Sequence, residues 1–299
     1  MPSRSSSKIE LRRARPLLGT LVEVRATAPT PVQAERALRA AFAAIRRVHA
    51  LMSFHDPQSD LSRLNRTAHR RAVRIHAWTF TVLRRAQKLH TATGGLFDIA
   101  MAPALVRGGW LPRSSTALPT TGGTAADICF LPDRRVRFHR PLLIDLGGIA
   151  KGFAVDRAVA ALRRHGATAG TINAGGDLRV FGRRPELVHV RRPESPGALV
   201  PLLELRSGAV ATSAHYFAQR CIRGIACAPI FHPLRRQLSR ETCSVTVQAP
   251  ECWLADALCK IVWLNAAAAA PLLRRYGARA WMLDARRHRP PLASPLHAA

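Results

Sequence analysis

Acidic side chains are scarce in this 299-residue chain, which has 18 Asp and Glu against 46 Lys and Arg and a formal net charge of +28. Such a surface attracts anionic partners of any class, nucleotides included. The basic residues are scattered, however, and the sequence lacks a zinc-finger spacing, an aromatic RNA-binding motif and a low-complexity basic tail. Proteins that bind nucleic acid specifically concentrate their charge on a recognisable element. The charge alone therefore does not predict a nucleic-acid-binding protein.

Metal-binding cysteine pairs and long apolar segments are also missing. The six cysteines form no CxxC pair, which argues against a cysteine metal site or a redox dithiol and predicts reduced thiols. No run of about 18 apolar residues is present for a membrane span. No apolar stretch follows the basic N-terminus as it would in a signal peptide. From these absences we expect a soluble, cytoplasmic protein without a lipid anchor.

Hydrophobic periodicity predicts a mixture of helices and strands. Apolar residues recur at helical spacing in 31–52, 76–93 and 253–264, and short alternating or apolar segments predict strands at 21–25, 136–140, 208–213, 244–247 and 281–283. Because helices and strands do not alternate strictly, the pattern is typical of an α+β protein. With 47% hydrophobic residues, a chain of this length can bury a large core. We expect one large domain over 16–284, with loose segments at 1–15 and 285–299.

The most informative stretch is LLIDLGGIAKG, residues 142–152. It predicts a short buried strand at 142–144 that is ended by Asp145 and followed by a Gly–Gly turn. Lys151 then falls at the start of a helix expected over 153–164. A glycine turn with open N–H groups, a helix N-terminus and a lysine together suit a phosphate or a diphosphate.

A second turn, NAGGD at 173–177, has the same composition. An ordinary strand–helix–strand crossover would explain the helix and the strands, but it would not explain why both Gly–Gly turns carry an acid. Ser59 is the expected cap of a helix after the first long one, where Ser62 and Asn65 are candidates to line a site. Thr212, at the end of an expected strand, is a candidate for a ligand-facing edge.

Taken in chain order, these and other short blocks resemble the ApbE family of FAD:protein FMN transferases. The blocks are LGT at 18–20, MS at 52–53, SRLN at 62–65, GGLFD at 94–98, DLGGIAKG at 145–152, NAGGD at 173–177, ATS at 211–213 and ADAL at 255–258. The resemblance implies an ApbE-like, T-fold-like α+β arrangement of mixed sheets with packed helices. It also implies transfer of FMN from FAD to a Thr or Ser hydroxyl of an acceptor flavoprotein, with release of AMP.

The resemblance further implies roles for individual residues. The implied FAD contacts are Leu18, His55, Leu96, Phe97, Asp98, Asp145, Lys151, Gly176, Asp177 and Thr212. Among them His55 takes the place of a flavin-stacking tyrosine, and Lys151 lies near the diphosphate. A Mg²⁺ ion is implied at the carbonyl of Gly148, at Asp256 and at position 260. In the family this metal bridges the diphosphate and stabilises the leaving AMP.

Two positions depart from the family's pattern. Lys260 stands where the family has a metal-binding threonine, four residues after Asp256 and therefore on the same helix face. A protonated ammonium has no lone pair for Mg²⁺, so Lys260 either lies near the metal position, where it supplies positive charge to the diphosphate or pairs with Asp256, or points to solvent. In the first case we expect FAD binding to depend less on Mg²⁺ than in relatives. The second departure concerns the family's activating His–Asp pair: aligned on the proline, His232 takes the place of the aspartate and Pro229 that of the histidine, whereas aligned on the histidine the aspartate is missing. His232 is in either case the candidate catalytic base.

The residues leave three functions open. The first is an FMN transferase, or an FAD pyrophosphatase that uses the same site. The second is an FAD-binding member of the family with reduced or lost transferase activity. The third, a cationic nucleic-acid binder, depends on the net charge alone.

Overall fold

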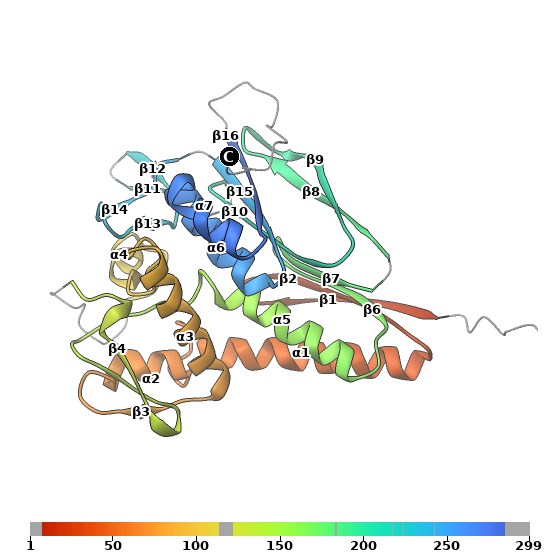
Figure 1. Cartoon of the computed structure of the whole chain (residues 1–299), viewed down its shortest axis with the longest axis horizontal. Helices are drawn as coiled ribbons and strands as arrows, with labels where there is room; N and C mark the ends of the chain where they lie inside the picture. The colour runs from red at the N-terminus through yellow and green to blue at the C-terminus, as the bar shows by residue number, and fades with distance from the viewer. Residues whose placement is uncertain are drawn as a thin grey trace, which may run out of the picture.

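The computed structural model of the chain (Figure 1) describes residues 8–113, 122–182, 184–216, 218–222, 224–241 and 243–284. Its main element is a seven-stranded sheet in which every pairing is antiparallel and the strand order is β1-β2-β6-β7-β10-β15-β16. These strands are β1 (Ile9–Leu17), β2 (Thr20–Ala28), β6 (Ala169–Ala174), β7 (Asp177–Phe181), β10 (Gly208–Ala214), β15 (Cys243–Ala249) and β16 (Arg279–Asp284). The α+β fold class expected from the sequence is confirmed.

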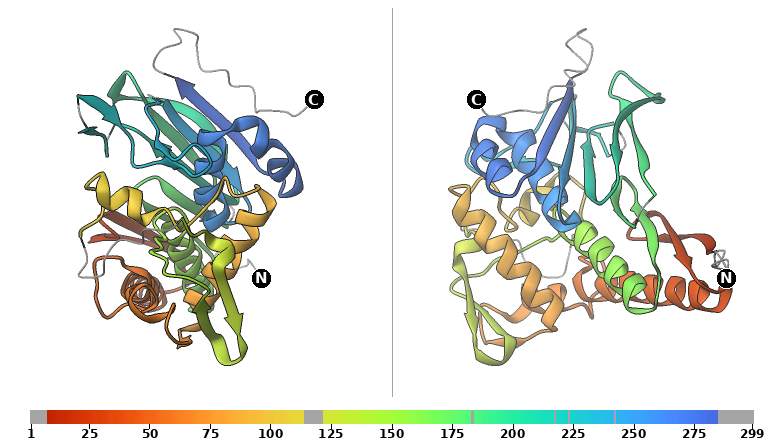
Figure 2. Two further views of the ribbon diagram at one scale, coloured as in Figure 1. Left: turned by 90° about the vertical axis from the view of Figure 1, so that its left-hand side faces the viewer. Right: turned by 45° about the vertical axis from the view of Figure 1, so that its right-hand side comes forward.

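Helices cover one face of this sheet, and a two-stranded ribbon covers part of the other (Figure 2). The helices are α1 (Pro31–Met52), α5 (Ala150–Arg164), α6 (Cys252–Leu264) and α7 (Ala266–Arg275), and the ribbon is β8 (Glu186–Arg192) with β9 (Ser195–Leu205). Side chains of β7 alternate between the two faces, because successive residues of a strand point in opposite directions. Phe181 packs in a cluster with α1 and α5, whereas Leu178 and Val180 pack against the ribbon.

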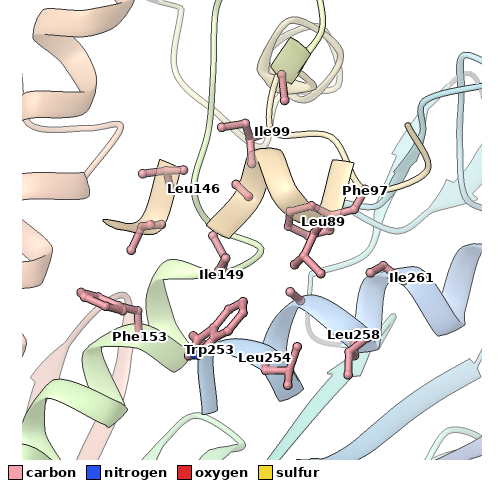
Figure 3. Close-up of a cluster of buried hydrophobic side chains, with 14 of the residues drawn as sticks. Leu89, Phe97, Ile99, Leu146, Ile149, Phe153, Trp253, Leu254, Leu258 and Ile261 are labelled. Atoms are coloured by element: carbon pink, nitrogen blue, oxygen red, sulfur yellow. The ribbon is translucent and has the colours of Figure 1, made fainter. Parts of the chain in front are cut away.

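Smaller elements lie at one end of the helical layer. They are α2 (Asp60–Thr67), α3 (Ala77–Ala92), α4 (Ala102–Arg107), the sheet of β3 (Val73–Arg74), β4 (Ile128–Leu131) and β5 (Arg135–Phe138), the 3-10 turns η1 (Ala125–Asp127) and η2 (Pro132–Arg134), and the pairs β11 (Arg220–Ile222) with β12 (Ile225–Cys227) and β13 (Phe231–His232) with β14 (Gln237–Leu238). A buried apolar cluster joins α3, the start of α5 and α6 (Figure 3). Leu89, Ile149 and Leu258 are fully or almost fully buried there.

The long helices begin and end close to where the periodicity placed them. Helix α1 spans the predicted 31–52, and the side chain of Thr30 accepts the N–H of Gln33 at its start. Helix α3 covers 77–92 with His76 as its cap, and α6 covers 252–264. Ser59 caps α2 as expected. No helix within the described residues is both long enough and apolar enough to cross a bilayer.

The strand predicted at 142–144 is wrong, although its residues are buried as expected. The segment runs through the core without a neighbouring strand, and the side chain of Asn65 bonds to its backbone. Asn65 donates to the carbonyl of Ile144 at 3.0 Å and accepts the N–H of the same residue at 2.9 Å. The buried side-chain amide of Asn65 therefore satisfies both the N–H and the carbonyl of Ile144, which a neighbouring strand would otherwise pair. Asn65, proposed to line a site, is instead committed to this contact.

The N-terminal segment is also corrected where it is described. Residues 9–15, expected to be loose, form most of β1, which pairs with β2 from Ile9 opposite Ala28 to Leu17 opposite Thr20. The sequence did not indicate this strand, because most side chains of this edge strand are exposed and the segment therefore lacks an alternation of apolar and polar residues. The predicted tail at 285–299 lies outside the described residues. The single domain over 16–284 stays a prediction.

Candidate functional site

The two predicted glycine turns lie at the start of α5 and between β6 and β7. In the second turn Gly175 and Gly176 have φ values of 63° and 99°. This conformation connects antiparallel strands through two residues and is strained for any residue with a Cβ. The side chain of Asn173 accepts the N–H of Gly176 at 3.0 Å. The turn thereby places Asp177 at the first position of β7, facing the helices.

Four charged side chains form a network between these turns and α6. The ammonium of Lys151 lies 2.8 Å from an Oδ atom of Asp177. Lys260 pairs with Oδ1 of Asp256, and the other oxygen of Asp256 accepts the N–H of Gly152 at 3.1 Å. The carboxylates are almost completely buried, with side-chain exposures of 1% for Asp177 and 0% for Asp256. The structure thus decides between the two predicted positions of Lys260: it pairs with Asp256.

Coupling within the network shifts the pKa values of its members. Burial raises the pKa of Asp177 to about 6, and the nearby charge of Asp256 adds to this effect, although both lysines oppose it. Burial also acts on Asp256, but Lys260 and Lys151 outweigh it and lower the pKa of that carboxyl. Desolvation lowers the pKa of Lys151, but the charges of Asp177 and Asp256 have a larger effect in the opposite direction. The pKa of Lys151 therefore lies above its usual range. Lys151 therefore carries its charge at neutral pH, and Asp177, not Asp256, is the carboxyl of this network that gains a proton first on acidification.

Other predicted residues lie against this network. A Cβ on Gly148 would stand 3.9 Å from Cε of Lys260 and 3.9 Å from the ring of Phe97, so these three residues converge. A Cβ on Gly176 would lie 3.8 Å from Cβ of Thr212. Eight of the predicted FAD-binding and metal-binding residues are therefore brought together: Phe97, Gly148, Lys151, Gly176, Asp177, Thr212, Asp256 and Lys260.

Asp98 and Asp145 lie in neighbouring segments and have different surroundings. The Asp145 N–H donates to the Ile99 carbonyl at 2.8 Å, which joins the two segments. One oxygen of Asp98 accepts the N–H groups of Ala100 and Ala125, at 2.8 and 3.1 Å. Burial raises the pKa of Asp98. Its side chain is 1% exposed, so these contacts hold the loop together from within.

Asp145 begins the first glycine turn by accepting the N–H of Gly147 at 2.9 Å. Burial raises the pKa of Asp145, while the backbone N–H groups and the charge of nearby His55 work in the opposite direction. His55 itself is exposed. Leu96 is buried, and Leu18 is half-buried with a φ of 57° at the turn between β1 and β2.

His232, the predicted catalytic residue, lies at the edge of the same region. Two residues further on, Leu234 stands 3.6 Å from where a Cβ on Gly95 would be, which places this hairpin beside the 94–98 segment. Partial burial and the charge of Arg235 lower the pKa of His232, so the ring is neutral at pH 7. Its Nδ1 accepts the N–H of Arg235 at 3.3 Å. The proton of the neutral ring is therefore on Nε2, which makes that atom a hydrogen-bond donor.

The donor set does not fit the implied Mg²⁺ site. Asp256 is paired with an ammonium, and the ammonium belongs to the residue expected to be the second side-chain ligand. Mg²⁺ requires oxygen ligands in near-octahedral geometry. Among the described residues, no cluster of three or more His, Cys, Asp or Glu side chains could hold a metal ion.

Sequence reasoning missed Asp156, which joins the helices of the site. It is buried on α5 and accepts the N–H groups of Cys252 and Trp253, both at 2.9 Å, and it pairs with Arg179. An acid on the buried stripe of a helix was the available signal. Asp156 also borders a hollow of about 230 Å³ along α5, which none of the predicted site residues lines.

The chain is an α+β protein in which helices cover an antiparallel sheet, and two glycine turns and two lysines meet at one point, an arrangement that suits an anionic group. Comparison with known proteins gives the family. The ApbE family profile matches residues 18–282, and the chain belongs to the ApbE family.

Individual relatives agree with this assignment. An FAD:protein FMN transferase of Vibrio cholerae is 26% identical over an alignment of 229 residues that covers 71% of this chain and 68% of that protein. One of Rhodobacter capsulatus is 28% identical over an alignment of 256 residues that covers 81% of this chain and 49% of that protein. The crystal structure of the ApbE protein of Thermotoga maritima superposes with a TM-score of 0.78 at 26% identity, covering 92% of this chain and 94% of that one.

Proposed function

We propose that this chain is an FAD:protein FMN transferase. The observation that carries the proposal is the convergence of both glycine turns on the network of Lys151, Asp177, Asp256 and Lys260, in a chain of the ApbE family. The relatives are named for this activity. The partner is an acceptor flavoprotein that offers a Thr or Ser hydroxyl.

The reaction joins the acceptor to the FMN half of FAD. The hydroxyl oxygen attacks the phosphorus nearest riboflavin, a new P–O bond forms, and the bond from that phosphorus to the bridging oxygen breaks. AMP leaves with the bridging oxygen, and the hydroxyl proton passes to solvent. Negative charge accumulates on the phosphate oxygens and on AMP in the transition state, so fixed positive charge at this point accelerates the transfer.

The residues of the network provide such charge without rearrangement. Lys151 and Lys260 each use part of their hydrogen-bonding capacity on an aspartate, and the remaining N–H groups are available to phosphate oxygens. The glycine turns allow a diphosphate to approach the backbone closely. The N-terminus of α5 adds the positive end of its dipole. With its proton on Nε2, His232 is able to donate a hydrogen bond to a phosphate oxygen.

A second candidate is an FAD-binding protein with reduced transfer activity. It is favoured by the surroundings of His232, because Nε2 already carries a proton and Nδ1, the nitrogen that could accept one from the acceptor hydroxyl, is engaged by the N–H of Arg235. If water replaces the acceptor, the same site would act as an FAD pyrophosphatase and release FMN and AMP.

The test is incubation of the purified protein with FAD and an acceptor flavoprotein domain. We expect fluorescent flavin to stay attached to the acceptor in a denaturing gel, with one AMP released per flavin transferred. The control acceptor carries Val or Ala in place of the acceptor Thr or Ser and stays unlabelled. A Lys151→Met variant should transfer about 100-fold more slowly, as expected when a group that stabilises transition-state charge is lost. Bound FAD without AMP would favour the second candidate, and FMN and AMP without labelled acceptor would indicate a pyrophosphatase.

A further inference from the structure

We propose that the ammonium group of Lys260 takes the place of a divalent cation beside Asp256, so that this chain binds the diphosphate of FAD without Mg²⁺. The inference rests on the proposed function for the identity of the ligand. It concerns how the site is charged, which can be measured apart from transfer.

Both carboxylate oxygens of Asp256 are already engaged. Its side chain is 0% exposed, Oδ1 pairs with Lys260, and Oδ2 accepts the N–H of Gly152 at 3.1 Å. A metal ion bound here would have to displace the ammonium from a buried carboxylate and bring its own water ligands into a packed space. Such a displacement would leave Lys260 without its partner next to a divalent cation.

The end of the Lys260 side chain is held in place on two sides. It lies four residues after Asp256 on α6, the spacing and order that bring an acid and a base together on a helix. Its Cε lies 3.9 Å from the position of a Cβ on Gly148, so the aliphatic part packs against the first glycine turn. Only 21% of the side chain is exposed. The charged end is thus fixed between α6 and that turn, which contributes the implied carbonyl ligand of the metal.

The charges of the network balance without a metal ion. Asp177 and Asp256 carry two negative charges, and Lys151 and Lys260 carry two positive charges, so the network is neutral as it stands. With an uncharged residue at position 260 the same network would be negative and would need a cation before it could accept a diphosphate. Addition of Mg²⁺ to the network with Lys260 places like charges side by side. The charge of Lys260 therefore makes diphosphate binding independent of a metal ion.

The experiment measures the Kd for FAD by titration calorimetry or flavin fluorescence, once with EDTA and once with millimolar Mg²⁺. Three proteins are compared: the parent, Lys260→Thr, and Lys88→Thr as the matched control at an exposed lysine of α3. We expect the parent and the control to bind FAD with the same Kd, within about twofold, in both buffers. Lys260→Thr should bind FAD about tenfold or more weakly in EDTA, the usual loss when a charged hydrogen-bonding group is removed. Mg²⁺ should restore most of its affinity, because the threonine supplies a neutral oxygen ligand beside Asp256.

A second variant and a second probe keep the test informative if Lys260→Thr misfolds. Lys260→Met keeps the aliphatic contacts with Gly148 and should bind FAD weakly in both buffers. Electron paramagnetic resonance of added Mn²⁺ should show no site in the parent–FAD complex beyond that of FAD itself, and one site in Lys260→Thr with FAD. If EDTA abolishes FAD binding by the parent and Mg²⁺ restores it, the inference is wrong.

The outcomes separate this inference from the proposed function. Metal-independent FAD binding without flavin transfer to any acceptor would uphold the role of Lys260 and contradict the transferase. Transfer that requires Mg²⁺ for FAD binding would uphold the transferase and contradict the role of Lys260. Failure of the parent to bind FAD in either buffer would contradict both.

Discussion

Replacement of Asp156 by alanine tests how the two helices of the site are held together. The carboxylate accepts two N–H groups of α6 and pairs with Arg179, and its side chain is only 7% exposed. Burial raises the pKa of Asp156 in spite of these partners. The charge itself therefore adds little to stability, and the main effect of its removal is to leave the three partners unsatisfied. Loss of one member of a buried pair costs about 3–5 kcal/mol.

The expected result for Asp156→Ala is a fall in the unfolding free energy of about 3–5 kcal/mol and a fall in Tm on the order of 10 °C. Urea and thermal unfolding followed by circular dichroism measure both quantities. Asp156→Asn should lose less than half as much, because an amide oxygen still accepts an N–H group. The control is Glu204→Ala, which removes an exposed acid paired with Arg206 and should change stability by no more than about 0.5 kcal/mol. A loss below about 1 kcal/mol for Asp156→Ala, or an equal loss for alanine and asparagine, would refute this account.

Three further predictions concern other parts of the structure. Asn65→Ala leaves both polar groups of the Ile144 peptide buried without partners and should lower the unfolding free energy by about 2–4 kcal/mol in urea titrations; a change within error would show that water replaces the amide. Gly152→Ala places a Cβ 2.3 Å from a carbonyl oxygen of α6, so we expect separated helices, about 1–3 kcal/mol of destabilisation and weaker FAD binding. Gly197→Ala has nothing within 4 Å of the new Cβ and should change neither quantity. The folded chain keeps the Asp177 proton up to a pKa of about 6, against 3.8 when unfolded. This group's contribution to stability therefore falls as pH rises between these values. Relative to the parent, Asp177→Asn should become more stable over that window, and a pH-independent difference in urea titrations would contradict the assigned pKa.

Sequence reasoning succeeded where one signal determined the structure. The stripe of Ala34, Leu38, Ala41 and Ile45 repeats at helical spacing, and all four residues are buried in α1. The NAGGD turn was predictable for a similar reason, because the φ values at its two glycines suit few other residues.

Sequence reasoning failed where the partner of a residue comes from a distant part of the chain. The residues at 142–144 are as apolar as a buried strand, and only the amide of Asn65, 79 positions from Ile144, removes the need for a neighbouring strand. For Lys260 the helical spacing left two orientations open, and packing against the first glycine turn decides between them. The tautomer of His232 depends on an N–H three residues away, which no pattern of residue types indicates.

Asp156 and Asp256, the buried acids of α5 and α6, each accept backbone N–H groups of the other helix. These mutual hydrogen bonds explain why the site lies where the two helices meet. Asp156 of α5 accepts N–H groups from the first turn of α6, while Asp256 of α6 accepts the N–H of Gly152 from the first turn of α5. These N–H groups have no partner within their own helices, so each helix start is satisfied by the other helix. The absence of a Cβ at Gly152 allows the close approach that this exchange requires. A change that separates α5 from α6 must therefore move Asp256, and with it the ammonium of Lys260, away from the glycine turns. Stability and FAD affinity should consequently fall together in Gly152→Ala.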